Sequence, residues 1–188
     1  MPKDSSKAPP QTLVDLRRDL DEQTEELSSL FRSVDDVRLL GRPPSGKWSP
    51  VEHVDHLIKV NQGYIGGLEA ALNRGRAAGK TGTGPFKGSV VGRFFARSME
   101  PPVKLRMKTM AAMKPAAELA VEPTLAVFLD LQGSLRERMT AAEGLDLDAI
   151  RMSSPFMKLV RAPVSSWFSV VLAHNRRHIW LIREALGV

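Results

Sequence analysis

Four long segments of this sequence carry apolar residues at intervals of three and four, the period of a helix with one buried face. They cover residues 13–34, 49–72, 123–143 and about 163–186. Alternation of apolar and polar residues, which is typical of a half-buried strand, is weak along the whole chain. The pattern predicts an all-α protein, a four-helix bundle with a long crossover between the second and third helices.

The second segment has a well-marked start and an unusual interior. Ser49 suits the N-cap of a helix, and Glu52 suits the third helical position, where its side chain completes a capping box. Farther along, Gly63, Gly66 and Gly67 each cost about 1 kcal/mol of helix stability relative to alanine. Glycines kept inside a helix predict that something approaches the helix closely there.

The predicted crossover, residues 73–115, differs in composition from the rest of the chain. It holds 10 basic residues and 1 acidic residue, whereas the whole chain has a formal net charge of +6. Such a segment can meet nucleic acid, an anionic lipid surface or an anionic small molecule, although a solvated surface explains it more simply. A short amphipathic helix is predicted within it by the spacing of Val90, Val91, Phe94, Phe95 and Met99. Its phenylalanines, including Phe86, are expected to pack onto the bundle.

Length and composition favour one soluble, cytoplasmic domain. A chain of 188 residues suffices for a single core, and we expect residues 1–10 to be a flexible tail and residues 11–188 to form that domain. The polar start lacks the apolar stretch of a signal peptide, and no apolar run approaches the roughly 20 residues of a membrane span. The absence of cysteine excludes a disulfide framework, a thiolate metal site and a cysteine nucleophile.

Two of the four histidines, His174 and His178, lie one helical turn apart in the middle of the last apolar stripe. Buried imidazoles need partners, because an unsatisfied polar group costs about 1–3 kcal/mol. Those partners can be a metal ion or simply buried carbonyl or carboxylate groups. A third metal ligand would come from His53 or His56 in the second helix, and the helical wheel alone favours His53.

Two motifs give the chain a resemblance to a known family. The stretch from Gly46 to Leu57, GKWSPVEHVDHL, resembles the second-helix signature of the DinB/YfiT-like superfamily, and His174-Asn175-Arg176-Arg177-His178 is similar to its last-helix motif. The resemblance implies a four-helix bundle whose metal ligands are His56, His174 and His178. His53 has no counterpart in the signature, and Leu181 stands where many relatives have glutamine.

The resemblance also implies a function. Three imidazoles leave at least one coordination position open, as in catalytic sites, and they suit zinc, nickel or iron. We expect a metal-dependent enzyme that transfers a low-molecular-weight thiol to an electrophilic small molecule. In keeping with the family, we expect a homodimer. Because the chain has no cysteine, the thiol must come from outside. Three alternatives stay open: metal-dependent hydrolysis, a metal-binding domain without catalysis, and binding of nucleic acid or another anionic ligand through residues 73–115.

Overall fold

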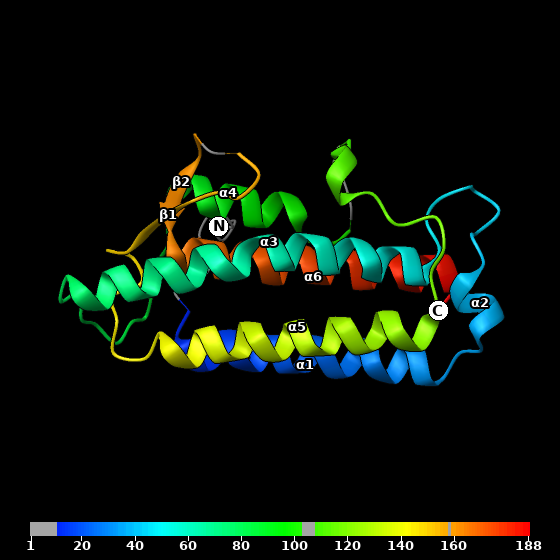
Figure 1. Ribbon diagram of the computed structural model, residues 1–188, viewed down its shortest axis with the longest axis horizontal. Coiled ribbons are helices and arrows are strands. Elements are labelled where there is room, and N and C mark those ends of the chain that lie inside the picture. The colour runs from blue at the N-terminus through cyan, green and yellow to red at the C-terminus, as the bar shows by residue number, and fades with distance from the viewer. Residues whose placement is uncertain (1–10, 103–107, 158) are drawn as a thin grey trace, which may run out of the picture.

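The computed structural model describes residues 11–102, 108–157 and 159–188, and the tail expected at residues 1–10 lies outside them. Four long helices form the bundle: α1 (Leu13–Arg32), α3 (Pro50–Ala77), α5 (Val121–Ala141) and α6 (Val164–Leu186). α3 and α6 lie in one layer, with α5 and α1 in the layer below (Figure 1). The all-α bundle predicted from the sequence is confirmed.

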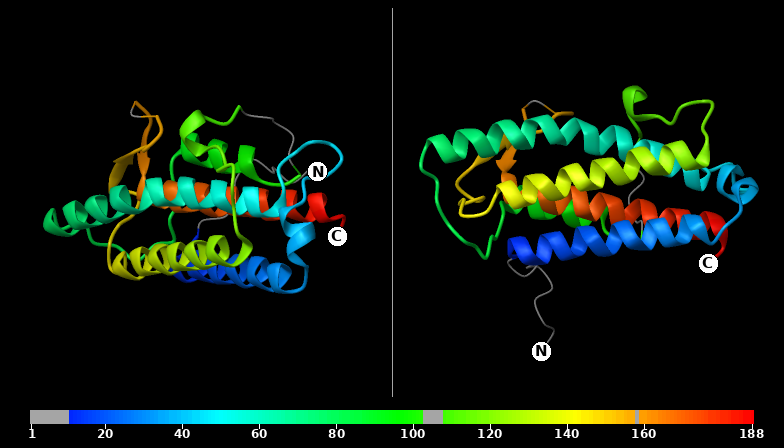
Figure 2. Two further views of the ribbon diagram at one scale, coloured as in Figure 1. Left: turned by 45° about the vertical axis from the view of Figure 1, so that its right-hand side comes forward. Right: turned by 60° about the horizontal axis from the view of Figure 1, so that its bottom comes forward.

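The shorter elements lie outside the bundle. α2 (Asp36–Leu40) follows α1, while α4 (Val90–Met99) and a 3-10 turn, η1 (Ala111–Met113), belong to the connection between α3 and α5. Two three-residue strands, β1 (Arg151–Ser153) and β2 (Arg161–Pro163), pair antiparallel just before α6. The chain crosses the outer side of α3 and α6 before it reaches α5, so α3 and α5 run in the same direction (Figures 1 and 2).

The start of α3 is built as the sequence predicts. The amide of Glu52 donates to the Ser49 hydroxyl, and the Glu52 carboxylate accepts the Ser49 amide at 2.8 Å. The helix continues five residues past Leu72, to Ala77, because Gly75 in this extra turn is buried against Ile150. The crossover is therefore residues 78–120 rather than 73–115.

The close approach predicted at the α3 glycines occurs at two of the three. A Cβ added to Gly63 would lie 2.6 Å from the Phe156 ring, and one added to Gly67 would lie 3.0 Å from the sulfur of Met152. At Gly66 such an atom would meet nothing within 4 Å. The segment that contains β1 therefore packs on α3 through the space that Gly63 and Gly67 leave.

The amphipathic helix predicted in the crossover is α4, and its packing differs in part from expectation. Phe86 is buried and Phe95 packs against the core, but Phe94 is 69% exposed beside the exposed Val90 and Val91. Packing of all three phenylalanines onto the bundle was therefore a wrong prediction, since α4 turns one apolar face outward. Among the residues that the structure describes, no helix combines the length and apolar character needed to cross a membrane.

Candidate metal centre

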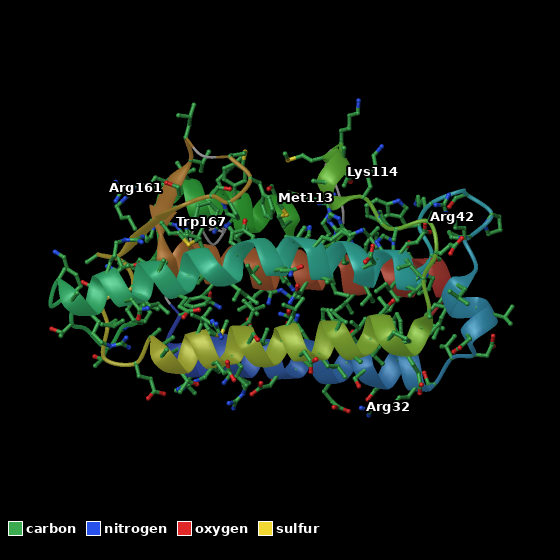
Figure 3. The ribbon with its side chains drawn as sticks, in the orientation of Figure 1. Arg32, Arg42, Met113, Lys114, Arg161 and Trp167 are labelled. Carbon is green, nitrogen blue, oxygen red and sulfur yellow. The ribbon has the colours of Figure 1, made fainter. Side chains whose placement is uncertain are left out.

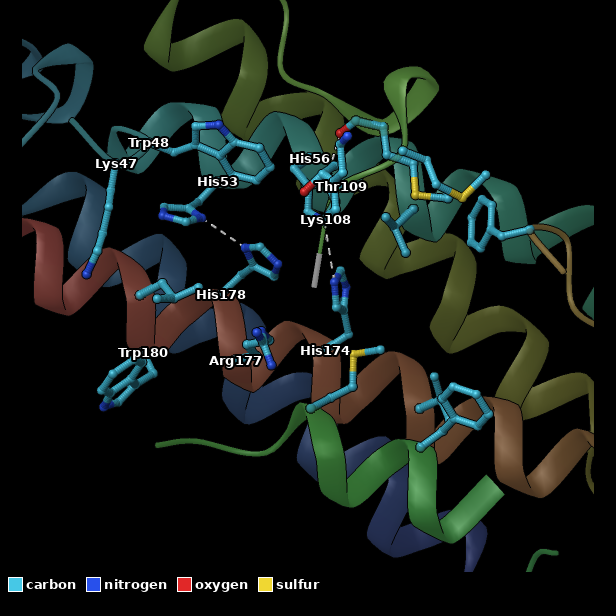
Figure 4. A pocket seen from close by; sticks show the side chains of 18 of the residues that line it. Lys47, Trp48, His53, His56, Lys108, Thr109, His174, Arg177, His178 and Trp180 are labelled. Atoms are coloured by element: carbon cyan, nitrogen blue, oxygen red, sulfur yellow. Dashed lines mark hydrogen bonds between the residues drawn. The ribbon is translucent and has the colours of Figure 1, made fainter. Parts of the chain in front are cut away.

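The four histidines come together on facing sides of two helices. His53 and His56 lie in the first turns of α3, and His174 and His178 lie near the middle of α6 (Figure 4). His53, His56 and His178 are each 5% exposed, and the Nδ1 atom of His174 is buried without a hydrogen-bond partner in the described residues. The site is thus a largely buried cluster of imidazoles.

The crossover fixes the orientation of His56. Its Nδ1 atom donates to the backbone carbonyl of Met113 at 2.7 Å, which leaves the lone pair of Nε2 free. That Nε2 atom faces the Nε2 atom of His174 at 3.4 Å. A histidine held through one nitrogen by a carbonyl, with the other nitrogen free, is the usual arrangement of a metal-binding imidazole.

Two polar side chains of α3 bind the crossover just after Met113. The Asp55 carboxylate accepts the amide of Ala116 at 2.9 Å and the Lys59 ammonium group at 2.7 Å. Lys59 also donates to the carbonyl of Lys114 at 2.7 Å. Asp55 and Lys59, which precede and follow His56 on α3, therefore attach the crossover to this helix. Figure 3 labels Met113 and Lys114 in this part of the crossover.

The nitrogen positions fit a metal ion. One ring nitrogen each from His56, His174 and His178 lie within 4.8 Å of one another. Metal–nitrogen bonds of 2.0–2.1 Å at a tetrahedral angle place two nitrogen atoms about 3.3 Å apart, and the His56–His174 separation is 3.4 Å. The unpartnered Nδ1 of His174 also shows that hydrogen bonds within the described chain do not satisfy this cluster. The three histidines could hold a metal ion.

His53 stands beside this group of three rather than within it. Its Nδ1 atom lies 2.9 Å from the Nδ1 atom of His178, so one ring donates a hydrogen bond to the other. When His178 is the donor, its Nε2 atom carries a lone pair and can bind a metal. His53, which the helical wheel favours, thus faces inward and contacts His178. His56, which the resemblance implies, has a ring nitrogen within 4.8 Å of those of His174 and His178, and its role as the third ligand stays a prediction.

Trp48 closes the side of the cluster near the start of α3. Its ring centroid lies 5.4 Å from that of His53 and 5.1 Å from that of His56. Trp48 precedes the N-cap and His53 is the fourth helical residue, which are the positions of a hydrophobic staple. Trp48 was not among the site residues predicted from the sequence, although its place directly before the capping box was a signal for it.

Glu52 has a structural environment. Its carboxylate caps α3 and also accepts two hydrogen bonds from Arg42, at 2.9 and 2.5 Å. The Arg42 hydrogen bond is the main cause that lowers the pKa of Glu52. This ion pair ties the preceding loop to the helix and so helps to hold Trp48 over the histidines.

Burial keeps the imidazoles neutral. It lowers the pKa of His53 and of His174 to about 3, and it lowers the pKa of His178 well below its ordinary value. Burial also lowers the pKa of His56, although the Met113 carbonyl opposes the shift. Only a neutral imidazole has a lone pair to offer, so at neutral pH the cluster is in its metal-binding form.

The cluster opens into a cavity of about 640 Å³ between α3, α6 and the crossover (Figure 4). All four histidines line it, together with Trp48, Arg177 and Leu181. Arg177 is 9% exposed, and its guanidinium donates to the carbonyl of Ser98 at 3.3 Å. Leu181 offers no hydrogen bond, so the polar role that glutamine could have at this position is lacking here.

The adjacent Arg176 has a different environment, because it binds acidic side chains away from the cavity. Its guanidinium donates twice to Glu100, at 3.0 and 2.6 Å, and once to Asp19 at 3.1 Å. These contacts join α6 to the end of α4 and to α1. Of the two arginines between His174 and His178, only Arg177 lines the cavity.

Comparison with known proteins agrees with this architecture. The sequence profile of the DinB superfamily matches residues 19–182, a range that includes all four histidines. Neither a comparison with curated proteins nor one with solved structures gave a match. Since the profile covers most of the 188 residues, the chain belongs to the DinB superfamily.

Proposed function

We propose that this protein is a metal-dependent enzyme in which His56, His174 and His178 hold a divalent ion and an external thiol is transferred to an electrophilic small molecule. The observation that carries the proposal is the cluster of three imidazole nitrogens within 4.8 Å, beside a cavity of about 640 Å³. A purely structural metal site has no need of such a cavity, whereas a catalytic site must admit a substrate. When bound, an ion with imidazole ligands would lower the pKa of a coordinated thiol or water.

The surrounding residues support an anionic thiol as one substrate. Lys47, Lys108 and Arg177 line the cavity, against one acidic residue, Glu184, among the lining residues that the structure describes. Cations of this kind can orient a carboxylate through charge-assisted hydrogen bonds. Of the ten basic residues in 73–115, only Lys108 lines the cavity within the described ranges, so this role passes mainly to Arg177 and Lys47.

His53 has a different role from the three proposed ligands. His53 is neutral, buried and hydrogen-bonded to His178, so it orients a neighbouring ring. Zinc, nickel and iron all suit imidazole ligands. Water bound to the same ion would support hydrolysis, which is the second candidate chemistry at this site.

The test is turnover with and without added thiol. Purified protein reconstituted with each metal is incubated with a panel of electrophiles and carboxylate-bearing thiols, and conjugates are detected by mass spectrometry. Thiol transfer requires the thiol and is lost in His174→Ala. Product formation without thiol would favour hydrolysis, and tight metal binding with no turnover in either assay would favour a non-catalytic metal-binding domain.

A further inference from the structure

The cavity extends along α3 and α6 in both directions from the histidines. The two helices are antiparallel (Figure 1), so residues that follow His56 on α3 lie opposite residues that precede His174 on α6. We call this end the apolar lobe; its walls include Val60, Tyr64, Phe95, Phe156, Trp167 and Val170. The opposite end, the polar lobe, includes Lys47, Trp180, Leu181 and Glu184.

The apolar lobe is lined mainly by aromatic and aliphatic side chains. The Tyr64 ring lies 5.7 Å from that of Trp167 and 5.4 Å from that of Phe156, measured between centroids. None of the six residues that define the apolar lobe has a charged side chain. A charged group bound among these six would lose its hydration without gaining a counter-ion from them, which is unfavourable.

One polar group of the apolar lobe is available to a ligand. Trp167 already donates its Nε1 hydrogen to the carbonyl of Met152 at 2.9 Å, and the Ser154 hydroxyl accepts the amides of Phe156 and Met157. The Tyr64 hydroxyl, in contrast, makes no hydrogen bond within the described part of the chain, although Tyr64 is only 5% exposed. Burial raises the pKa of Tyr64, so the hydroxyl keeps its hydrogen and can donate it.

The length of the lobe follows from helix geometry. Tyr64 lies eight residues after His56, which is about 12 Å along a helix that rises 1.5 Å per residue. A ligand that reaches from the histidines to the Tyr64 hydroxyl is therefore the size of two fused rings with a short substituent. A bare low-molecular-weight thiol would not fill this space.

We propose that the apolar lobe is the binding site of the electrophile, and that the electrophile is an apolar, ring-sized molecule with an uncharged oxygen acceptor for the Tyr64 hydroxyl. The carboxylate-bearing thiol then enters from the polar lobe, where Lys47 lies. The identification of this ligand as the electrophile rests on the proposed function. The position of the apolar lobe and the chemical class of its ligand follow from the lining residues alone.

The probe that tests the lobe is prodan, an uncharged naphthalene with a propionyl group, whose emission moves to longer wavelength when its carbonyl accepts a hydrogen bond. Titration of the full-length protein should give saturable 1:1 binding. Val170→Phe narrows the lobe and should weaken binding at least tenfold. Leu181→Phe, the matched change in the polar lobe, should leave the Kd within about twofold.

Tyr64→Phe tests the hydrogen bond separately. It keeps the ring but removes the hydroxyl, so bound prodan should emit at shorter wavelength than in the wild type. Val60→Phe, on the opposite wall, repeats the blocking test if Val170→Phe fails to fold. Absence of saturable binding, equal affinity of Val170→Phe and Leu181→Phe for prodan, or unchanged emission in Tyr64→Phe would overturn the inference.

Metal titration of the same variants separates this inference from the proposed function. Val170→Phe should still bind one metal ion per chain, because it leaves all four histidines in place. Prodan binding without any thiol transfer would support the apolar lobe as a binding site and contradict the proposed function. Thiol transfer to a small polar electrophile, with no prodan binding, would support the proposed function and contradict the ligand class of the lobe.

Discussion

The Nδ1 atoms of His53 and His178 lie 2.9 Å apart, inside a cluster where His178 also lies close to His56 and His174. Only one of the two nitrogens can carry the shared hydrogen. When it stays on His178, the Nε2 atom of that ring is free to bind a metal, and His53 is the acceptor that favours this tautomer. His53 is therefore a positioning residue for His178.

We predict that His53→Ala lowers metal affinity by about 10–100-fold, the usual effect of removing a partner of a metal-binding histidine, while binding stays at one ion per chain. His53→Asn, which can place an amide oxygen near the same position, should recover part of the loss. Calorimetric titration with a competing chelator measures both quantities. Loss of stoichiometric binding in His53→Ala, with binding retained in His56→Ala, would make His53 the third ligand instead.

For the three proposed ligands we predict a larger loss of metal affinity. His56→Ala, His174→Ala and His178→Ala should each weaken binding by at least about 100-fold, because two imidazoles cannot close the site. Circular dichroism should show an intact helical fold in each, since α3 and α6 are held by extensive apolar contacts elsewhere. Wild-type affinity in any of the three would remove that histidine from the ligand set.

The pH dependence of stability follows from the lowered pKa values. In the unfolded chain a histidine takes up a proton near pH 6.5, whereas burial lowers the pKa of His53 and His174 to about 3 in the folded protein. Between pH 6.5 and pH 3 the unfolded state therefore binds more protons than the folded state. The contribution of these groups to the unfolding free energy is fully present above pH 6.5 and decreases as the pH falls toward 3. Each such group contributes about 1.4 kcal/mol per pH unit.

Urea unfolding of the metal-free protein between pH 7 and pH 5 measures this slope. His53→Ala should have a shallower slope than the wild type, because one of the buried imidazoles is gone. A stability that is flat over this range in the wild type would mean that the cluster is hydrated or already charged. Metal should also dissociate over the same range, since protons compete for the nitrogens.

Much of this architecture could be predicted from the sequence, because each long helix with one buried face has a regular spacing of apolar residues. The period of three and four marks α1, α3, α5 and α6, and the Ser49–Glu52 capping box marks the start of α3 within one residue. Gly63 and Gly67 correctly predicted a close neighbour, whereas Gly66 has none within 4 Å. Strands β1 and β2 could not be predicted in this way, since three residues are too few to establish an alternating pattern.

The site was harder to predict, for two physical reasons. His53 and His56 are three residues apart on α3, so both side chains can face α6. A helical wheel cannot distinguish a proposed ligand from a residue that hydrogen-bonds to a ligand. The Met113 carbonyl that orients His56 is a backbone group, and backbone groups carry no sequence signal. Likewise, exposure of Phe94 depends on how α4 lies on α6, which the amphipathic pattern of α4 does not fix.

The glycines of α3 offer a matched pair for testing the packing of the β1 segment. Gly66→Ala adds a methyl group where nothing lies within 4 Å, so it should raise the unfolding free energy by about 0.5–1 kcal/mol. Gly63→Ala places its Cβ 2.6 Å from the Phe156 ring. The ring must move, and this variant should be less stable than Gly66→Ala by about 1–3 kcal/mol. Equal stability of the two would show that Phe156 does not rest on Gly63.

The last prediction concerns Asn175, which stands beside His174 yet faces the bundle interior. It is fully buried and joins three helices: its Oδ1 accepts from Asn61 of α3 at 3.2 Å, and its Nδ2 donates to Gln132 of α5 at 3.1 Å. Asn175→Ala would leave both partners buried and unsatisfied. Each unsatisfied group costs about 1–3 kcal/mol, so we expect a loss of roughly 2–4 kcal/mol.

Chemical denaturation measures that loss, and Arg183→Ala on the same helix is the control. Arg183 pairs with Glu26 at 3.1 Å, but its side chain is 52% exposed. An exposed pair contributes at most about 1 kcal/mol, so the control should be nearly neutral. If Asn175→Ala lowers the unfolding free energy as little as Arg183→Ala does, the hydrogen bonds of Asn175 to Asn61 and Gln132 do not hold α6 against α3 and α5. The spacing of the histidines must then depend on apolar packing alone.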